Sequence, residues 1–189
     1  MGLTLLYHFL ALGSNLSSKI GGSLHTLESA IDKLKACGLE VTSTSKWYST
    51  PAFPVGKGPD FVNGAISVKS RRTPKDVLEI IHSVEDELGR VRRERWAPRV
   101  CDIDLIASGG MICPSVEIWR HWADLPLERQ LEEQPSQLIL PHPRLHERGF
   151  VLKPLADIAP DWVHPVLNLT VEKMLEALPG EALADVREI

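Results

Sequence analysis

The segment RWAPRVCDIDLI, residues 95–106, contains the clearest fold signal in the chain. It places two aspartates inside an otherwise apolar run. Asp102 and Asp104 are two residues apart, so on a β-strand both side chains project from one face, about 6.5–7 Å apart. The residues around them face the other way, toward a helix-covered core: Cys101, Ile103 and Leu105. The alternation predicts a strand over 100–107 with one apolar and one acidic face.

Paired carboxylates of this kind suit Mg²⁺ that is bound jointly with substrate phosphates. The D-x-D triplet is common, however, and outward, solvated positions on a half-buried strand explain it equally well. The aspartates are accompanied by a dense group of arginines: Arg90, Arg92, Arg93, Arg95 and Arg99. Arginine forks bind phosphate bidentately and stay charged. Beside the aspartates, a phosphate clamp is therefore favoured over a solvated basic loop.

The charge of the chain is uneven. The net charge is −4, yet residues 90–99 hold five arginines and one glutamate, so the other 179 residues carry −8. A nucleic-acid binder usually spreads basic charge over a whole face. One basic cluster in an acidic chain better suits a compact polyanion such as a nucleoside triphosphate.

The bulk composition predicts a single globular domain over 1–189, with 43% hydrophobic and 24% charged residues. Three scattered cysteines without a C-x-x-C pair argue against a disulfide framework or a zinc site, and favour a cytoplasmic location. The apolar start MGLTLLYHFLAL is too short to span a bilayer and reads as a buried strand, so no membrane partner is expected. P-loop, H-E-x-x-H and G-x-S-x-G motifs are absent from the sequence.

Hydrophobic periodicity and turn residues predict six elements in β-α-β-β-α-β order: strand 3–12, helix 22–37, strand 41–48, strand 61–70, a helix opened by Thr73 and Pro74 and ended by Gly89, and strand 100–107. This order is typical of a ferredoxin-like α+β fold, an antiparallel sheet with helices on one face. A C-terminal elaboration follows, with a short helix within 138–165 and a terminal helix near 169–178.

The elaboration begins with an insertion at 109–137. Trp119, Trp122 and, less regularly, Leu127 and Leu131 suggest an amphipathic helix there. We expect this helix to cover core surface, with a partner contact as the alternative.

Five motifs, in sequence order, resemble the 6-hydroxymethyl-7,8-dihydropterin pyrophosphokinases of folate biosynthesis: ALGSNL (11–16), YSTPAF (48–53), PDFVNGAISV (59–68), GRVRRERWAPRVCDIDLI (89–106) and LPHPRLHERGFVLKPLADIAP (140–160). The similarity covers about residues 5–107 and 138–165. It implies a cytoplasmic enzyme that transfers the β,γ-diphosphate of ATP, as one unit, to the hydroxymethyl oxygen of the pterin. The products would be AMP and the pterin pyrophosphate.

The resemblance also implies roles for individual residues. The catalytic residues would be Arg90, Arg99, Asp102 and Asp104, with the two aspartates holding two Mg²⁺ ions. The ATP-binding residues would be Glu85, Arg92, Arg93, Arg95, His142 and Arg148. The pterin-binding residues would be Gly13, Thr50, Pro51, Phe53, Phe61, Asn63, Trp96 and Phe150. Judged without the resemblance, Phe61 and Phe150 are more simply explained by core packing.

Three features depart from the family pattern. The arginine loop is one residue shorter than in other members, so the roles of Arg92 and Arg93 are interchangeable. The insertion is longer than the usual connection, and Pro143 stands where an aromatic residue can occur, which leaves part of the adenosine contact open. Two other functions are the alternatives: an RNA-binding ferredoxin-like module, and an inactive pterin- or nucleotide-binding regulator. The sheet lacks the aromatic pattern of RNA-binding modules and the chain is acidic, so no nucleic-acid partner is expected. The oligomeric state is open, with a monomer slightly favoured.

Overall fold

The computed structural model describes residues 4–52, 58–90 and 99–189. The first part of the chain contains β1 (Leu6–Ser14), α1 (Ser23–Ala36), β2 (Glu40–Thr44), β3 (Tyr48–Thr50), β4 (Phe61–Ser70), α2 (Pro74–Glu87) and β5 (Asp102–Ser108). The second part contains α3 (Val116–Ala123), α4 (Leu127–Glu132), the 3₁₀ turn η1 (Leu145–Glu147), α5 (Gly149–Ile158), α6 (Val171–Glu176), the 3₁₀ turn η2 (Gly180–Ala182) and β6 (Arg187–Glu188).

The strands form an antiparallel sheet in the order β5-β1-β4-β3-β6, with β2 also paired to β4. With α1 and α2, this order confirms the predicted β-α-β-β-α-β core and its α+β class. The strand predicted over 41–48 is divided into β2 and β3, which lie along the same edge of β4. At the break, the Trp47 ring lies over Gly64, where an added Cβ would be only 2.6 Å from the ring. The break between β2 and β3 thus allows the Trp47 ring to pack over Gly64, which has no side chain.

Local sequence signals account for α2. The Thr73 hydroxyl accepts a hydrogen bond from the Asp76 N–H at 3.2 Å, and the Asp76 carboxylate accepts one from the Thr73 N–H at 3.0 Å. Pro74 occupies the first turn, where its missing N–H costs nothing. This capping box fixes the start of the helix where the sequence predicted it.

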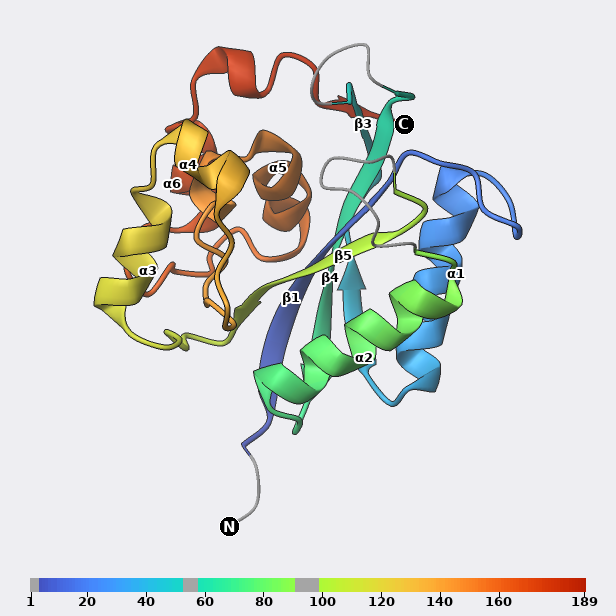
Figure 1. Cartoon of the computed structure of the whole chain (residues 1–189), viewed down its shortest axis with the longest axis horizontal. Helices are drawn as coiled ribbons and strands as arrows, with labels where there is room; N and C mark the ends of the chain where they lie inside the picture. The colour runs from blue at the N-terminus through green and yellow to red at the C-terminus, as the bar shows by residue number, and fades with distance from the viewer. Residues whose placement is uncertain (1–3, 53–57, 91–98) are drawn as a thin grey trace.

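The two faces of the sheet are covered by different parts of the chain, as Figure 1 shows. On one face, α1 and α2 enclose an apolar core that includes Leu10, Leu12 and Ile66. On the other face, α5 and α6 enclose a second, smaller core around Phe9 and Ile106. The ferredoxin-like core thus has its helices on one face, and the C-terminal elaboration covers part of the other.

The insertion differs from the single helix that its periodicity predicted. It forms two short helices, α3 and α4, because Pro126 at the start of α4 cannot continue α3. Trp119 is 2% exposed and its ring lies against the rings of His146 and His164, while the covering of core surface by the insertion stays a prediction. In the part of the chain that the structure describes, no helix is both long enough and apolar enough to cross a lipid bilayer.

Candidate active site

Asp102 and Asp104 lie on the face of β5 that is turned away from α1 and α2. Ile103 and Leu105, between and beyond them, are 2% and 4% exposed and belong to the core under those helices. Cys101 belongs to the same core. The two aspartates are partly buried on the opposite face. The predicted division of this strand into an apolar and an acidic face is confirmed.

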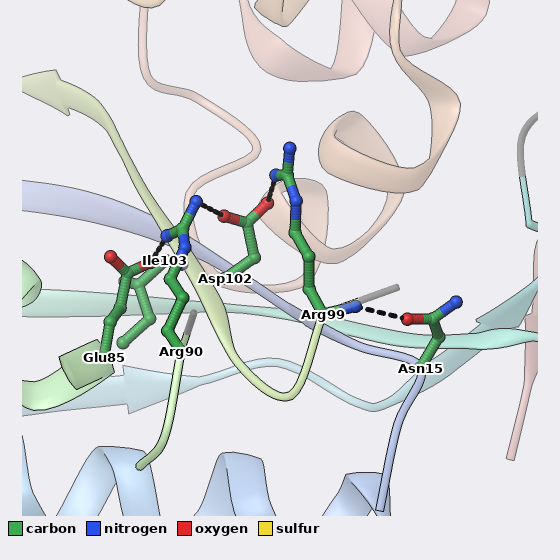
Figure 2. A network of polar contacts seen from close by, with 6 residues as sticks. All are labelled: Asn15, Glu85, Arg90, Arg99, Asp102 and Ile103. Carbon is green, nitrogen blue, oxygen red and sulfur yellow. Dashed lines mark hydrogen bonds and ion pairs between the residues drawn. The ribbon is translucent and has the colours of Figure 1, made fainter. Parts of the chain in front are cut away.

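Two arginines hold the Asp102 carboxylate between them (Figure 2). Arg90, just after α2, places Nη2 2.7 Å from Asp102 Oδ1. Arg99, just before β5, bonds the other carboxylate oxygen through Nη1. Arg90 also pairs with Glu85 through its Nη1. Two of the arginines predicted to bind phosphate are therefore gathered at the first predicted metal ligand.

Burial opposes charge throughout this cluster. Burial raises the pKa of Asp102, and Asp104 adds to the effect, while Arg99 and Arg90 oppose it. Burial alone would lower the pKa of Arg90, but the Asp102 and Glu85 carboxylates raise it overall. Each charged group in this cluster needs its oppositely charged partners, because an unpaired buried charge lowers the stability of the fold.

Glu85 supports the cluster from the core side of the sheet. Its side chain has no exposed surface, and its carboxylate accepts a hydrogen bond from the Ile103 N–H at 2.8 Å. Burial raises the pKa of Glu85 to about 7, against the opposing effects of that hydrogen bond and of Arg90. Its place among the ATP-binding residues stays a prediction. Because its buried carboxylate pairs with Arg90, we expect Glu85 to position Arg90 and not to contact ATP directly.

Asn15 is a site residue that the sequence did not single out, although it lies in the quoted ALGSNL motif. Its Oδ1 accepts a hydrogen bond from the Arg99 N–H at 2.8 Å, and its own N–H donates to the Arg99 carbonyl at 3.1 Å (Figure 2). Its Nδ2 donates to the Pro59 carbonyl at 3.2 Å. Asn15 thus fixes the backbone of Arg99 relative to the end of β1.

One row of residues crosses three strands of the sheet at the site: β4, β1 and β5. Asn63 pairs with Gly13, and Gly13 with Asp102. Directly opposed residues share a face and neighbouring strands lie about 4.8 Å apart, so Asn63 and Asp102 are separated by about 10 Å. Only Gly13 lies between them, and an added Cβ there would be 3.3 Å from Asn63 Oδ1. The row therefore has an amide end, a flat floor and a carboxylate end.

Further residues predicted to bind pterin gather around the amide end of this row. Asn63 is buried, and its Nδ2 donates to Thr50 Oγ1 at 2.8 Å. Phe61 pairs with Thr50 across the strands and is partly exposed. Pro51 directly follows Thr50 and is partly buried. These residues are neighbours on β3 and β4, and their role in binding a pterin stays a prediction.

Phe150 lies in the first turn of α5 and is 40% exposed, so core packing does not account for it. The Arg148 guanidinium carbon is 5.8 Å from the centre of the Phe150 ring. Burial lowers the pKa of Arg148, while the nearby Asp104 and Asp102 charges act to raise it. Arg148 therefore connects the aromatic ring to the carboxylate end of the site.

Backbone hydrogen bonds fix the position of His142, and one of its ring nitrogens already accepts a hydrogen bond. Its N–H donates to the Ile106 carbonyl at 2.7 Å, and its Nδ1 accepts from the Arg144 N–H at 3.1 Å. Burial, with Arg148 and Arg144 nearby, lowers the pKa of His142 to about 3. The imidazole is therefore neutral at physiological pH, with its proton on Nε2, and is a hydrogen-bond donor there.

A pocket of about 510 Å³ opens beside these groups and includes Asp104, His142, Arg144 and Arg148 in its lining. This volume is within the range of about 300–1,000 Å³ that is usual for small-molecule sites. Five predicted site residues lie outside the described part of the chain: Phe53, Arg92, Arg93, Arg95 and Trp96.

Asp102 and Asp104 are the carboxylates of the described site that could bind a metal. Within residues 4–52, 58–90 and 99–189, no three His, Cys, Asp or Glu side chains gather closely enough to form a metal site. Asp102 and Asp104 supply two carboxylates on one face, which fits Mg²⁺, an ion that commonly takes one or two carboxylates and completes its shell with phosphates and water.

The chain is similar to known proteins in sequence and in fold. Residues 9–160 match the family model described as 7,8-dihydro-6-hydroxymethylpterin-pyrophosphokinase. A Synechocystis protein named 2-amino-4-hydroxy-6-hydroxymethyldihydropteridine pyrophosphokinase is 36% identical over 169 residues, which cover 89% of this chain and 76% of the relative. A protein of the same name from Methylorubrum extorquens is 38% identical over 156 residues, covering 82% and 84% of the two chains.

The solved structure of wild-type HPPK-DHPS from Plasmodium falciparum with SDX-DHP is similar in fold, with a TM-score of 0.64 at 16% sequence identity. The match covers 92% of this chain but 44% of the Plasmodium chain, so this chain spans less than half of that protein. At this identity the likeness concerns the fold, and it agrees with the α+β architecture described above.

Proposed function

Because the chain belongs to the 7,8-dihydro-6-hydroxymethylpterin-pyrophosphokinase family, we infer that it is an ATP-dependent diphosphotransferase of folate biosynthesis. It transfers the β,γ-diphosphate of ATP to the hydroxymethyl oxygen of 6-hydroxymethyl-7,8-dihydropterin and releases AMP. The observation that carries the residue assignments is the row across the sheet, with Asn63 at one end, Asp102 at the other and Gly13 between them. This row offers a place for a flat heterocycle directly beside a place for phosphates.

We assign the amide end of the row to the pterin. An amide both donates and accepts hydrogen bonds, which matches the mixed donor and acceptor edge of a pterin ring. Asn63 and Thr50 supply these groups, while Gly13 leaves the floor flat. Phe150 and Phe61 supply aromatic surface, which suits stacking on a planar ring. The roles of Pro51, Phe53 and Trp96 at this end remain part of the proposal.

We assign the carboxylate end to the phosphates and Mg²⁺. Asp102 and Asp104 are the residues that would hold the metal, and two ions are the number we propose. Bound Mg²⁺ would neutralise charge on the phosphates. Arg90 and Arg99, which now share the Asp102 carboxylate, would be the cations nearest to the reacting groups. His142 and Arg148 would donate hydrogen bonds to the phosphates, and the same role is proposed for Arg92, Arg93 and Arg95.

Catalysis of this reaction depends mainly on alignment of the two substrates and neutralisation of phosphate charge, and it needs no covalent intermediate with the protein. The hydroxymethyl oxygen forms a bond to the β-phosphorus, and the bond from that phosphorus to the bridging α,β-oxygen breaks. The hydroxyl proton is lost to solvent, and AMP leaves with the bridging oxygen. The arginines counter the negative charge that moves onto the leaving phosphate, which is the contribution expected of fixed guanidinium groups.

An AMP-release assay tests this function. ATP, Mg²⁺ and 6-hydroxymethyl-7,8-dihydropterin are incubated with the protein, and AMP is measured with each component omitted in turn. We expect AMP to form only in the complete mixture. Folded protein that releases no AMP above background would defeat the assignment. Binding of an unrelated single-stranded RNA at ordinary salt would instead favour the RNA-binding alternative, for which no described residue gives support.

A further inference from the structure

The insertion at 109–137 lines the same pocket as the phosphate-binding candidates. Of the seventeen described residues that line the pocket, eight belong to the insertion: Trp122, Leu125, Gln130, Glu133, Gln134, Pro135, Ser136 and Gln137. The charged part of the lining, with Asp104 and Arg148, lies beside the carboxylate and arginine cluster. The remaining part is mostly apolar and amide in character, which suits the uncharged portion of a nucleotide better than its phosphates.

The insertion is anchored to the segment that carries His142. Cys113 and Leu140 exchange backbone hydrogen bonds of 2.9 and 3.0 Å. Trp119, buried in α3, donates from its Nε1 to the Pro141 carbonyl at 2.8 Å. His142 follows directly and is itself bonded to β5 through Ile106. The wall formed by the insertion is therefore held in place relative to the phosphate end of the pocket.

The two tryptophans of α3 have different environments. Trp119 is 2% exposed and fixes the helix, whereas Trp122 is partly exposed and lines the pocket. Leu125, buried after the end of α3, and Leu78 of α2 add apolar surface to the same lining. An aromatic ring at the side of such a pocket is a suitable surface for a nucleobase, because every base has a stacking face.

We propose that the insertion forms the nucleoside side of the ATP site, with Trp122 as its main contact and Gln137 as a polar contact. This proposal rests on the proposed function, since it takes the ligand to be ATP. It makes the insertion an element that determines nucleotide affinity, in addition to a cover for the core.

The test measures binding without turnover. Titration calorimetry with Mg²⁺-ATP, in the absence of pterin, compares the wild type with Trp122→Ala, Trp122→Phe and the control Ile118→Ala. Ile118 is an exposed residue of the same helix that does not line the pocket. Loss of a base-stacking ring should weaken ATP binding about tenfold in Trp122→Ala. Trp122→Phe should recover most of this loss, and Ile118→Ala should bind as the wild type does.

Inorganic tripolyphosphate with Mg²⁺ separates a nucleoside contact from a general disturbance of the pocket. It has no base or ribose, so Trp122→Ala should bind it as the wild type does. Equal ATP affinity in Trp122→Ala and the wild type would overturn the proposal, and so would equal weakening of ATP and tripolyphosphate. Should Trp122→Ala fail to fold, the exposed Gln137→Ala should show a threefold or larger loss for ATP alone, and no loss would overturn the proposal.

The same measurements distinguish this inference from the proposed function. Wild-type protein that binds Mg²⁺-ATP through Trp122 but releases no AMP with pterin would defeat the function and support the nucleoside wall. Wild-type protein that releases AMP but binds ATP independently of Trp122 and Gln137 would support the function and overturn the wall. Wild-type protein that does not bind Mg²⁺-ATP would overturn both.

Discussion

The two faces of the sheet are built from the same strands but serve different ends. Toward α1 and α2, the strands present a continuous apolar surface that includes Leu10, Leu12 and Ile103. Toward α5 and α6, the side chains on β1 become smaller along the strand, from Phe9 through Ala11 to Gly13. Apolar packing covers the Phe9 end of this face, and the candidate site occupies the Gly13 end.

This difference explains how the molecule can hold several charges at one place. Buried charges lower stability unless they are paired, so a site of this kind needs stabilisation from elsewhere. The closed face supplies it through close-packed aliphatic side chains. Neighbouring residues on β5 should therefore respond to mutation in opposite ways, one losing activity and the other losing stability.

The largest effect is expected at Asp102. In Asp102→Asn, the residue keeps its shape but loses the charge that pairs with Arg90 and Arg99. We expect kcat for AMP release to fall by about a thousandfold, because both a metal ligand and the arrangement of the arginines are lost. Asp86→Asn, at an exposed position on α2, is the matched control and should keep full activity. Near-normal kcat in Asp102→Asn would remove this residue from the catalytic assignment.

The adjacent residue should show the reverse behaviour. Ile103→Ala leaves a cavity in the core under α1 and α2, and we expect it to lower the free energy of unfolding by about 2–5 kcal/mol. Activity per folded molecule should stay within a few-fold of the wild type, since the backbone N–H that serves Glu85 is retained. Urea unfolding, with the exposed Ile118→Ala as control, measures the difference. A large fall in kcat without a loss of stability would contradict the division between the two faces.

Glu85 is the residue that crosses this division, because it is a carboxylate on the closed face. Its pKa is raised from 4.5 to about 7, so it favours the folded state most when protonated. The stability that it contributes is complete below about pH 4.5 and is lost as the pH rises through about 7. Relative to Glu85→Gln, the wild type should lose on the order of 1–3 kcal/mol of unfolding free energy between pH 4.5 and pH 8.

Urea unfolding at the two pH values gives this difference. Glu79→Gln, at an exposed position of the same helix, should retain the pH dependence of the wild type. If Glu85→Gln showed the same pH dependence as the wild type, the Glu85 carboxyl would titrate normally, and its burial beside Arg90 would have no effect on its charge.

Most of the closed face could be predicted from the sequence because its signals are local. The strand predicted over 61–70 has those bounds in β4, and Thr73 and Pro74 start α2 as predicted. Periodicity reports which residues are buried, and capping residues report where a helix starts. The alternating faces of β5 followed from spacing alone. Such signals need no knowledge of distant parts of the chain.

The features that were missed depend on contacts between distant residues. Asn15 reaches Arg99 across 84 positions, and nothing local distinguishes it from an ordinary turn residue. The break between β2 and β3 depends on Trp47 meeting Gly64 on another strand. The periodicity of residues 109–137 predicted one helix, but Pro126 separates the segment into α3 and α4. Motif similarity, by contrast, brought together residues such as Asn63 and Asp102 that spacing could not relate.

The smallest effect is expected at the floor of the open face. In Gly13→Ala, the new methyl group would lie 3.3 Å from Asn63 Oδ1 and 3.8 Å from the Phe61 ring, which is tight but allowed. It would rise into the space where a flat ring is proposed to lie. We therefore expect KM for the pterin to rise about three- to tenfold, corresponding to roughly 1 kcal/mol. Affinity for Mg²⁺-ATP should not change.

The control for this substitution is Gly22→Ala, because no atom lies within 4 Å of an added Cβ at that position. Gly22→Ala should leave both KM for the pterin and affinity for Mg²⁺-ATP unchanged. The separation of the two substrates is the decisive result, because a general disturbance of β1 would also move Asp102, its neighbour across the strands. Equal losses for pterin and ATP in Gly13→Ala would mean that the row is a single packed unit. A loss for pterin alone would mean that its amide end and its carboxylate end can be altered independently.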